Sequence, residues 1–574
     1  CGHGKVEKDG VIYGNKAHYQ HHGAWFAANG YVCLILDTLQ LGEVPGLHHG
    51  TNREGMWWWL SKGYTPAGIE VWNGIRAIDY LVSRPEVDPS RLGVTGRSGG
   101  GAMSWYLGAV DDRLKVVVPV AGITDLRDHL IAGNPKVAFP HGVIDGHCDC
   151  MYFNNTYRWD YSMLAALVAP KALLVVNTDL DPIFPEAGVR RIFGSLETVY
   201  GWYGARDRLD LLIGKGGHQD TEEIRHPSFA WFERWLKDGK GLAVADIKEP
   251  DRKLPIESLK VLPLKKPLPA NVNDTVHESF ATAPPHVNPP KSASEWDALS
   301  AKWRALLKEK AFAGWPADTT GLTSEHPYAA QSRGQSAEIA KGGLGLTAYD
   351  FRSHDHPGLK LRVWSFESPG RQAKPADARL VVLDPKGWDR YKGLIAAFET
   401  VDGNPAAHPE FDAIKRDVEA GVRVSFFAPR GVGPTAWSKA NDTSIRRRFG
   451  LLGQTLDGMR VLDVRRAVRS LTFPDAPALT LVGDGDASTL ALWGAVFAPE
   501  VGKVVLASPP ATVRDGPAFL NLDRVLTMPQ AVALLYPRAV VIENSPPEPW
   551  AWTRDLARNL GATTPWPAIE PKGR

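Results

Sequence analysis

The chain of 574 residues is long enough for two or more domains, each with a hydrophobic core of its own. Its 66 basic and 64 acidic residues leave a formal net charge of +2, which gives no electrostatic reason to expect nucleic acid or another polyanion as a partner. Four cysteines are too few for a disulfide scaffold, and no apolar run reaches the ~20 residues that cross a bilayer. We therefore expect a globular protein without a membrane-spanning segment.

The first elements in chain order are a strand and a helix. Residues 31–37 form an apolar run that predicts a buried strand, and apolar residues recur at helical spacing between Ile69 and Leu81. A turn at 88–91 leads into the next strand, which begins at Leu92. Strands that alternate with helices predict a mostly parallel sheet and hence an α/β fold.

The stretch from Leu92 to Gly101 carries the strongest motif. An apolar strand passes into Gly96-Arg97-Ser98-Gly99-Gly100, and a helix is expected from Ala102 to Val110. This Gly-x-Ser-x-Gly pattern is the nucleophile elbow of α/β-hydrolases, which holds the serine at the tip of a tight turn between strand and helix. The helix N-terminus stabilises developing negative charge. Ser98 is therefore the predicted nucleophile; an ordinary serine in a glycine-rich turn is the alternative.

Two later strands end in the other residues of a hydrolytic triad. The strand at 171–176 is followed by Asp179 and Asp181, and the strand at 209–213 is followed by a glycine-rich loop with His218. The chain order Ser, Asp, His is that of α/β-hydrolases, whose chemistry lies at strand C-termini. We assign the acid role to Asp181, because Asp-x-x-Phe-Pro resembles the acid turn of this superfamily, and expect Asp179 to cap or brace the loop.

A triad of Ser98, Asp181 and His218 predicts ester or peptide hydrolysis through an acyl-enzyme, without a cofactor or metal. An oxyanion hole is also needed. The first residues, Cys1-Gly2-His3-Gly4, look like the His-Gly loop that follows the third strand of this fold. An amide of Gly2 or His3 is therefore expected to join that of Gly99.

This oxyanion loop stands at the start of the chain, although a hydrolase domain has two or three strands before it. We therefore expect the first domain to lack its N-terminal strands. In the usual order the third strand lies between the fourth and the fifth, so its absence leaves a gap beside the elbow strand. Alternatively, Cys1 is the lipid-carrying first residue of a mature lipoprotein.

The segment from Asp125 to Trp159 is long, weakly periodic and rich in Gly, His and aromatic residues, so we expect a cap loop over the pocket. Within it, Cys148 and Cys150 lack the Cys-x-x-Cys spacing of a zinc knuckle, and no second cysteine pair exists. We expect these cysteines and His147 to form a pocket wall or a redox-linked pair, and no metal site.

Residues 1 to about 240 resemble bacterial α/β-hydrolases of the acetyl-xylan-esterase-like group. The resemblance is carried by the elbow, Tyr19-Gln20-His21-His22-Gly23-Ala24-Trp25-Phe26, Leu36-Asp37-Thr38-Leu39-Gln40-Leu41-Gly42-Glu43, Arg53-Glu54-Gly55-Met56-Trp57-Trp58-Trp59 and Gly146-His147-Cys148-Asp149-Cys150. It implies a periplasmic or secreted serine esterase that acts on acylated oligosaccharide or polysaccharide. The expected pocket residues are Glu54, Trp58, His147 and Trp159, with residues 57–59 serving either as a sugar-stacking platform or, more commonly for such residues, as core.

Residues 241–319 are rich in proline and lysine and predict a linker that carries one amphipathic helix, Ser294 to Lys310. Residues 320–574 then repeat the rhythm of the first domain, with a strand, the turn Gly483-Asp484-Gly485-Asp486-Ala487, a helix and another strand. Gly485 takes the place of Ser98, Glu548 aligns with Asp181, and no histidine follows. We expect a degenerate, non-catalytic α/β-hydrolase-like domain that packs on the first; an unrelated α/β domain is the alternative.

The sequence thus favours a serine carboxylic-ester hydrolase that removes acyl groups, acetyl first, from carbohydrate. A prolyl-oligopeptidase-like serine peptidase is the alternative within enzymes, because its elbow and acid turn look alike. A non-catalytic carbohydrate-binding or scaffold protein is the alternative outside them. The type of ester and the oligomeric state do not follow from the sequence.

Overall fold

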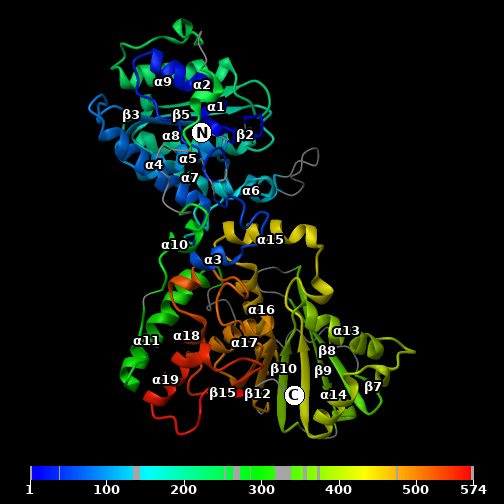
Figure 1. Ribbon diagram of the computed structural model, residues 1–574. Helices are drawn as coiled ribbons and strands as arrows, with labels where there is room; N and C mark the ends of the chain where they lie inside the picture. Colours follow the sequence, from blue (N-terminus) through cyan, green and yellow to red (C-terminus); the bar gives the residue numbers. More distant parts are fainter. Residues whose placement is uncertain are drawn as a thin grey trace. The chain divides into compact units, whose positions relative to one another are not determined.

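The computed structural model describes residues 3–4, 6–37, 39, 41–44, 46–132, 142–250, 254–262, 272–284, 286–316, 338–352, 358–371, 375–472 and 476–570. The chain divides into two compact units (Figure 1). Unit 1 comprises Cys1–Trp59, Tyr64–Ala281 and Gly450–Leu452, and unit 2 comprises Leu60–Gly63, Thr282–Phe449 and Gly453–Arg574. Among the described residues, no helix is both long and apolar enough to span a membrane.

Unit 1 is built on a four-stranded parallel sheet in the order β3-β4-β5-β6. Its strands are β3 Leu92–Arg97, β4 Leu114–Val120, β5 Ala172–Thr178 and β6 Leu209–Gly214, with a small hairpin of β1 Glu7–Lys8 and β2 Val11–Ile12. Its helices are α1 Gly14–His18, α2 Gln20–Ala28, α3 Trp58–Lys62, whose last residues belong to unit 2, α4 Pro66–Val82, α5 Gly99–Val110, α6 Leu126–Ile131, α7 Tyr161–Ala166, α8 Glu186–Trp202, α9 Glu222–Leu236 and α10 Val276–Ser279.

Helices cover both faces of this sheet because its central strands are apolar on both sides. On β4, Val116 and Val118 pack with α2 and α9, whereas Val117 packs with α4, α5, α7 and α8. On β5, Leu174 packs with α2 and α9, whereas Leu173 packs with the helices on the other face. Successive side chains of a strand point to opposite faces, so near-continuous apolar runs are required where both faces are buried. The expected parallel α/β architecture is confirmed.

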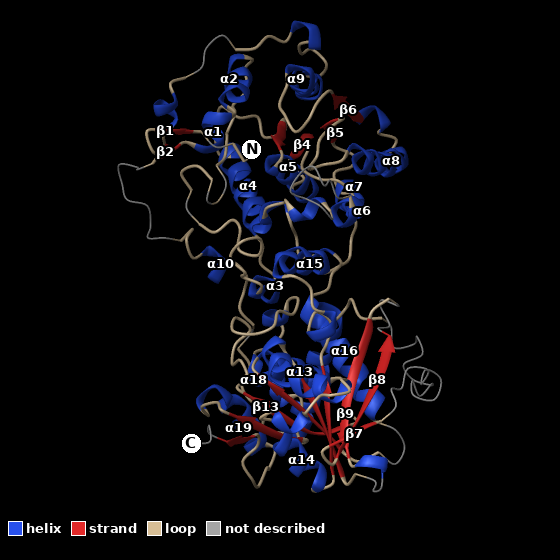
Figure 2. Cartoon of the chain, turned by 90° about the vertical axis from the view of Figure 1, so that its right-hand side faces the viewer, coloured by secondary structure: helices blue, strands red, loops and turns tan. Residues whose placement is uncertain are grey.

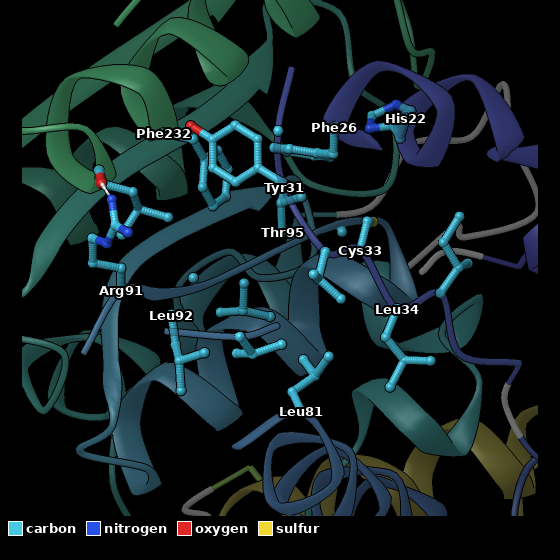
Figure 3. A pocket seen from close by; sticks show the side chains of 18 of the residues that line it. His22, Phe26, Tyr31, Cys33, Leu34, Leu81, Arg91, Leu92, Thr95 and Phe232 are labelled. Atoms are coloured by element: carbon cyan, nitrogen blue, oxygen red, sulfur yellow. Dashed lines mark hydrogen bonds between the residues drawn. The ribbon is translucent and has the colours of Figure 1, made fainter. Parts of the chain in front are cut away.

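The segment 31–37, expected to be a buried strand, is not one. The segment has no regular secondary structure, and Val32, Cys33 and Leu34 are exposed. A cavity of about 310 Å³ lies between this segment and β3, lined by residues 30–35 and 92–97 and by Phe232 (Figure 3). A strand needs a hydrogen-bonding neighbour, and the place beside 31–37 is this cavity. The cavity lies where a gap beside the elbow strand was expected.

Unit 2 contains a nine-stranded sheet in the order β15-β14-β13-β12-β10-β11-β9-β8-β7. Its strands are β7 Ile339–Lys341, β8 Leu344–Arg352, β9 Lys360–Glu367, β10 Asp377–Val382, β11 Val422–Phe427, β12 Leu479–Asp484, β13 Val501–Ala507, β14 Ala539–Glu543 and β15 Ala568–Glu570. Its helices are α11 Ala293–Leu306, α13 Pro385–Glu399, α14 Phe411–Glu419, α15 Lys439–Leu451, which reaches into the residues grouped with unit 1, α16 Leu456–Leu471, α17 Asp486–Val496, α18 Met528–Ala533 and α19 Ala551–Asn559.

The strand order of unit 2 is that of an α/β-hydrolase sheet. From β11 to β15 all neighbours are parallel, and β7, β8 and β9 add an antiparallel edge. In Figure 2 the strands form one twisted sheet with helices around it. β10 lies between β11 and β12, which is the crossed position of the third strand in this fold.

The two units share one unusual turn. Ser98, between β3 and α5, has φ 61° and ψ −120°, and Gly485, between β12 and α17, has φ 54° and ψ −123°. The expected correspondence of Gly485 with Ser98 therefore extends to backbone conformation. In unit 1 a serine holds this left-handed conformation, which L-residues rarely adopt, whereas a glycine adopts it without steric cost.

The described parts of two expected loop regions pack in the cores of the units. In the expected cap segment, the described residues 125–132 and 142–159 include α6 and two short 3₁₀ helices, and residues such as Val143, Ile144 and Tyr152 are fully buried. The expected linker 241–319 is divided between the units: Ile247 packs in the core of unit 1, and Trp303 of α11 packs in that of unit 2. Large apolar side chains at regular spacing bury themselves even in proline-rich surroundings.

The elbow gives a test of packing. A Cβ on Gly101 would lie 2.4 Å from the carbonyl oxygen of Ala121, whereas one on Gly194 of α8 would meet nothing within 4 Å. We expect Gly101→Ala to lower the free energy of unfolding by ~3 kcal/mol, because backbone must move. Gly194→Ala is expected to raise it by ~0.5 kcal/mol, because the unfolded chain loses freedom.

Urea denaturation followed by circular dichroism measures both variants. Equal stability of Gly101→Ala and the wild-type protein would contradict the close approach of α5 to the end of β4.

Candidate active site

Ser98 lies at the tip of the turn between β3 and α5, with 9% of its surface exposed. Its amide donates a hydrogen bond to the carbonyl of Val120 (3.0 Å), and its own carbonyl accepts one from Ala102 (2.9 Å). These bonds fasten the strained residue to the neighbouring strand and to the first turn of the helix. Strain of this kind persists only where the surroundings hold it in place.

His218 and Asp181 are in direct contact. His218 Nδ1 donates to Asp181 Oδ2 over 2.7 Å, and Asp181 Oδ1 accepts hydrogen bonds from the amides of Ile183 (2.9 Å) and Phe184 (3.0 Å). Asp181 is buried. Its carboxylate is therefore held by the turn after β5 and orients the imidazole, so that Nε2 is the nitrogen left for proton transfer.

The structure shows one of the two hydrogen bonds that a triad needs. The bond between imidazole and carboxylate is present, whereas the described residues include no hydrogen bond between Ser98 Oγ and His218. Contacts of this kind are often long without substrate and tighten in the substrate complex.

Asp179 has a different environment from Asp181. Its carboxylate accepts a hydrogen bond from the Gly216 amide (2.9 Å) and pairs with Lys215 Nζ (2.9 Å). Both partners belong to the loop that carries His218. The structure therefore places Asp181 against the histidine and Asp179 against the backbone of the histidine loop.

Asp220, two residues after His218, is the centre of an ion-pair network. Its Oδ2 lies 3.1 Å from His21 Nε2, 2.9 Å from His22 Nε2 and 3.2 Å from Arg225 Nη1. Burial raises the pKa of Asp220, but these partners outweigh it and hold the pKa far below its ordinary value. The network ties the histidine loop to α2 and α9, and the arginine gives it a fixed positive charge that disfavours a bound cation.

A second cluster lies beside the elbow. His3 Nε2 is 3.1 Å from Cys150 Sγ and 3.4 Å from Cys148 Sγ, and the two sulfur atoms are 2.7 Å apart. His48 completes the group, with ligand atoms of all four residues within 4.8 Å of one another. Burial raises the pKa of the Cys148 thiol, but the hydrogen bond from Cys150 and the charge of His3 outweigh it and hold the pKa well below its ordinary value.

This cluster touches the glycine that follows the nucleophile. A Cβ on Gly99 would lie 2.8 Å from His3 Nε2 and 3.3 Å from Cys150 Sγ. The cluster therefore requires a glycine at position 99. Of the expected oxyanion donors, Gly99 heads α5, His3 directs its side chain to the cysteines, and Gly2 lies outside the described residues.

The expected pocket residues differ in their burial and contacts. Glu54 is exposed, and Trp58 is buried in a small core with Trp59 and Tyr64. His147 is fully buried behind Phe184 and hydrogen-bonds to the Ile183 carbonyl through Nε2 (3.1 Å). Trp159 is 39% exposed and lies against Tyr157. Trp58 and His147 thus pack against other side chains of unit 1, and their role in a pocket stays a prediction. The sequence does not distinguish the packing of large side chains in a core from stacking on a ligand.

The sequence did not indicate a role for three residues of these clusters, which are His48 and the pair His21 and His22 around Asp220. Each contacts a partner about a hundred or more residues away. The adjacent histidines at 21–22 and 48–49 were the one available signal, and it did not indicate their partners.

The Asp220 network predicts a pH-dependent contribution to stability. A carboxylate whose pKa is depressed by folding stabilises the protein above its unfolded pKa of about 3.9, and this contribution decreases as the pH falls below that value. We expect Asp220→Asn to lower the free energy of unfolding by ~2 kcal/mol at pH 7, and the difference from wild type to shrink at pH 3.

Urea unfolding at both pH values measures this difference. The exposed Asp207→Asn variant is the control and should match wild type; an Asp220→Asn deficit that is the same at pH 7 and pH 3 would contradict the assignment.

This chain is similar to parts of two curated proteins. "Putative hydrolase YtaP" of Bacillus subtilis is 29% identical over 208 residues, 36% of this chain and 66% of that protein. The 4-O-methyl-glucuronoyl methylesterase of Neurospora crassa is 22% identical over 198 residues, 32% of this chain and 50% of that protein. The chain thus spans between half and two thirds of the length of these relatives.

Solved structures of two esterases are similar to this chain with TM-scores below 0.5. The "putative acetyl xylan esterase" of Bacteroides fragilis has a TM-score of 0.40 at 13% identity, over 54% of this chain and 84% of that one. The glucuronoyl esterase of Solibacter usitatus has a TM-score of 0.35 at 15% identity, over 51% of this chain and 94% of that one.

A family model gives the clearest match. The model of the prolyl oligopeptidase family aligns with residues 17–238, which include the elbow, the acid turn and the histidine loop. The matched residues also carry the parallel sheet and the turn at Ser98, so this part of the chain is similar to the prolyl oligopeptidase family in both sequence and fold.

Proposed function

We propose that unit 1 is a serine carboxylic-ester hydrolase that removes acyl groups, acetyl first, from carbohydrate. The observation that carries the proposal is the pairing of His218 Nδ1 with buried Asp181 (2.7 Å) in a domain whose Ser98 has the elbow conformation. These three residues come from the ends of three strands of one sheet.

The chemistry follows from this geometry. His218 Nε2 takes the proton of Ser98 Oγ as the oxygen attacks the ester carbonyl, and Asp181 stabilises the imidazolium that forms. The Gly99 amide at the N-terminus of α5 donates to the developing oxyanion. His218 then returns the proton to the leaving alcohol, and water releases the acyl group by the same steps in reverse.

The name of one curated relative supports a carbohydrate ester as the substrate. The Neurospora crassa protein is a methylesterase of 4-O-methyl-glucuronoyl groups. A methyl ester of a sugar acid and an acetyl ester of a sugar hydroxyl place the sugar on opposite sides of the carbonyl. An assay with acetylated xylan oligosaccharide beside a glucuronate methyl ester therefore separates the two.

The family match favours a second candidate, a serine peptidase, because the family is named for an oligopeptidase. Both candidates use the same triad. A prolyl peptide substrate in the same assay distinguishes them, since the esterase proposal expects kcat/KM for the ester to exceed that for the peptide by orders of magnitude.

We further propose that unit 2 is non-catalytic. Gly485 keeps the elbow conformation but has no side chain, and His408, the last histidine of the chain, precedes the elbow strand β12. The elbow of unit 2 therefore lacks the hydroxyl of a nucleophile, whereas the sheet and its apolar core persist. Its role is then structural or in binding.

The first test removes the nucleophile. We expect Ser98→Ala to lower kcat for a small activated acyl ester by about 10³-fold or more, with an unchanged circular dichroism spectrum, because the triad acts as a unit. Ser104→Ala, in the same helix, is the matched control and should keep its activity. Ser98→Ala with wild-type turnover would refute the esterase proposal.

The second test separates the two aspartates. Asp181→Asn is expected to lower kcat by ~10⁴-fold, because the amide favours the wrong imidazole tautomer. Asp179→Asn, which affects only the brace to Lys215 and Gly216, is expected to change kcat less than tenfold. The reverse ranking of the two variants would assign the acid role to Asp179.

A further inference from the structure

We propose that His3, His48, Cys148 and Cys150 bind one zinc ion beside the nucleophile elbow. The four residues come from three separate parts of unit 1, and their ligand atoms all lie within 4.8 Å of one another. His48, Cys148 and Cys150 are buried, and His3 is partly buried. The sequence argument against a metal was the lack of a second cysteine pair; the fold provides a pair of histidines in its place.

The distances suit a tetrahedral site. Zinc–sulfur and zinc–nitrogen bonds of about 2.3 and 2.0 Å place neighbouring ligands about 3.3 to 3.8 Å apart. His3 Nε2 is 3.1 and 3.4 Å from the two sulfur atoms, and neither cysteine forms a disulfide. The two sulfur atoms, 2.7 Å apart, need to separate by about 1 Å when the ion enters.

A carboxylate stands behind one of the histidines. Glu70 Oε1, on α4, lies 3.3 Å from His48 Nδ1, and only 3% of the Glu70 surface is exposed. Histidines that bind zinc commonly donate their other ring nitrogen to a carboxylate, which fixes the tautomer and orients the ring. Because Glu70 lies beside Nδ1, Nε2 is the nitrogen of His48 that would bind the ion.

The segments that carry the ligands are held together independently of an ion. Asp149, between the two cysteines, accepts hydrogen bonds from Thr51 N (2.8 Å) and Thr51 Oγ1 (2.6 Å). This fastens the His48 segment to the cysteine segment. Gly4, next to His3, donates its amide to Asn15 Oδ1 (2.8 Å). A site that is preorganised in this way loses little conformational entropy when it binds its ion.

The donor set selects the metal. Two thiolates and two imidazoles in a compact arrangement suit zinc, whereas calcium and magnesium require oxygen ligands. Four protein ligands close the coordination sphere, so the ion is structural and activates no water. Because His3 and Cys150 touch Gly99, the ion fixes the first residues of the chain against the elbow.

Metal content tests the proposal without reference to esterase activity. We expect the full chain, expressed with zinc and purified under reducing conditions, to carry one zinc ion per chain by atomic emission. Cys150→Ser and His48→Gln are expected to retain less than about a fifth of that amount. The matched controls are Cys33→Ser, an exposed cysteine outside the group, and His49→Gln, the neighbour of His48; both should keep one zinc ion.

Cobalt provides a second measurement on unaltered protein. Exchange of zinc for Co²⁺ should give the visible absorption of tetrahedral cobalt and a sulfur-to-metal charge-transfer band. A chelator should release the ion together with two newly reactive thiols and lower the thermal midpoint by roughly 5 °C or more.

Zinc content is measured both in the ligand variants and in the wild-type protein, so a variant that fails to fold does not decide the result. The proposal would be overturned by wild-type protein that neither carries nor takes up zinc and shows no tetrahedral cobalt spectrum. A Cys148–Cys150 disulfide in the purified protein would also overturn it. So would full zinc content in a variant that lacks both cysteines. Since zinc is measured directly, a failed esterase assay does not affect this result.

Discussion

The close approach of the first turn of α5 to the end of β4 is the constraint on which unit 1 depends. Gly101 lies against the carbonyls of Val120 and Ala121, and Gly122, at φ +108°, would place a Cβ 2.2 Å from the Ala102 amide. No side chain larger than hydrogen fits on either side of this contact. It holds Ser98 in a left-handed conformation at the end of β3, so that its hydroxyl and the Gly99 amide lie at the head of one helix.

The same backbone turn occurs in unit 2 with a glycine in place of the serine. The angles at Gly485 match those at Ser98 within about ten degrees, and the strand order around β12 is that of an α/β-hydrolase. Apolar strands are retained wherever the core needs them, whereas a serine or histidine that contributes nothing to packing can be replaced without loss of the fold. The backbone conformation of the turn is therefore kept in unit 2 without the serine side chain.

Two polar networks flank the elbow of unit 1 and differ in chemistry. Around Asp220, the fixed charge of Arg225 balances the carboxylate, and the network braces the loop of His218. Around Cys148 and Cys150, the partners are imidazoles, and Glu70 stands behind one of them. Buried polar groups stabilise a fold only when each has a partner, so both networks need groups that the fold brings in from distant segments.

The parts of the candidate site could be recognised in the sequence because each is a short motif at the end of a strand. The elbow at Ser98, the turn at Asp181 and the loop of His218 each follow an apolar run, and parallel strands bring their C-termini to one edge. The likeness of Gly485 to Ser98 could be predicted for the same reason. Contacts between distant segments could not. Residues 31–37 have the composition of a strand but pair with no strand among the described residues, and Trp58 packs in a small core with Trp59 and Tyr64. His3 and His48 meet Cys148 and Cys150 only through tertiary packing, because a sequence records residue types along the chain and not which loops share a corner of the sheet.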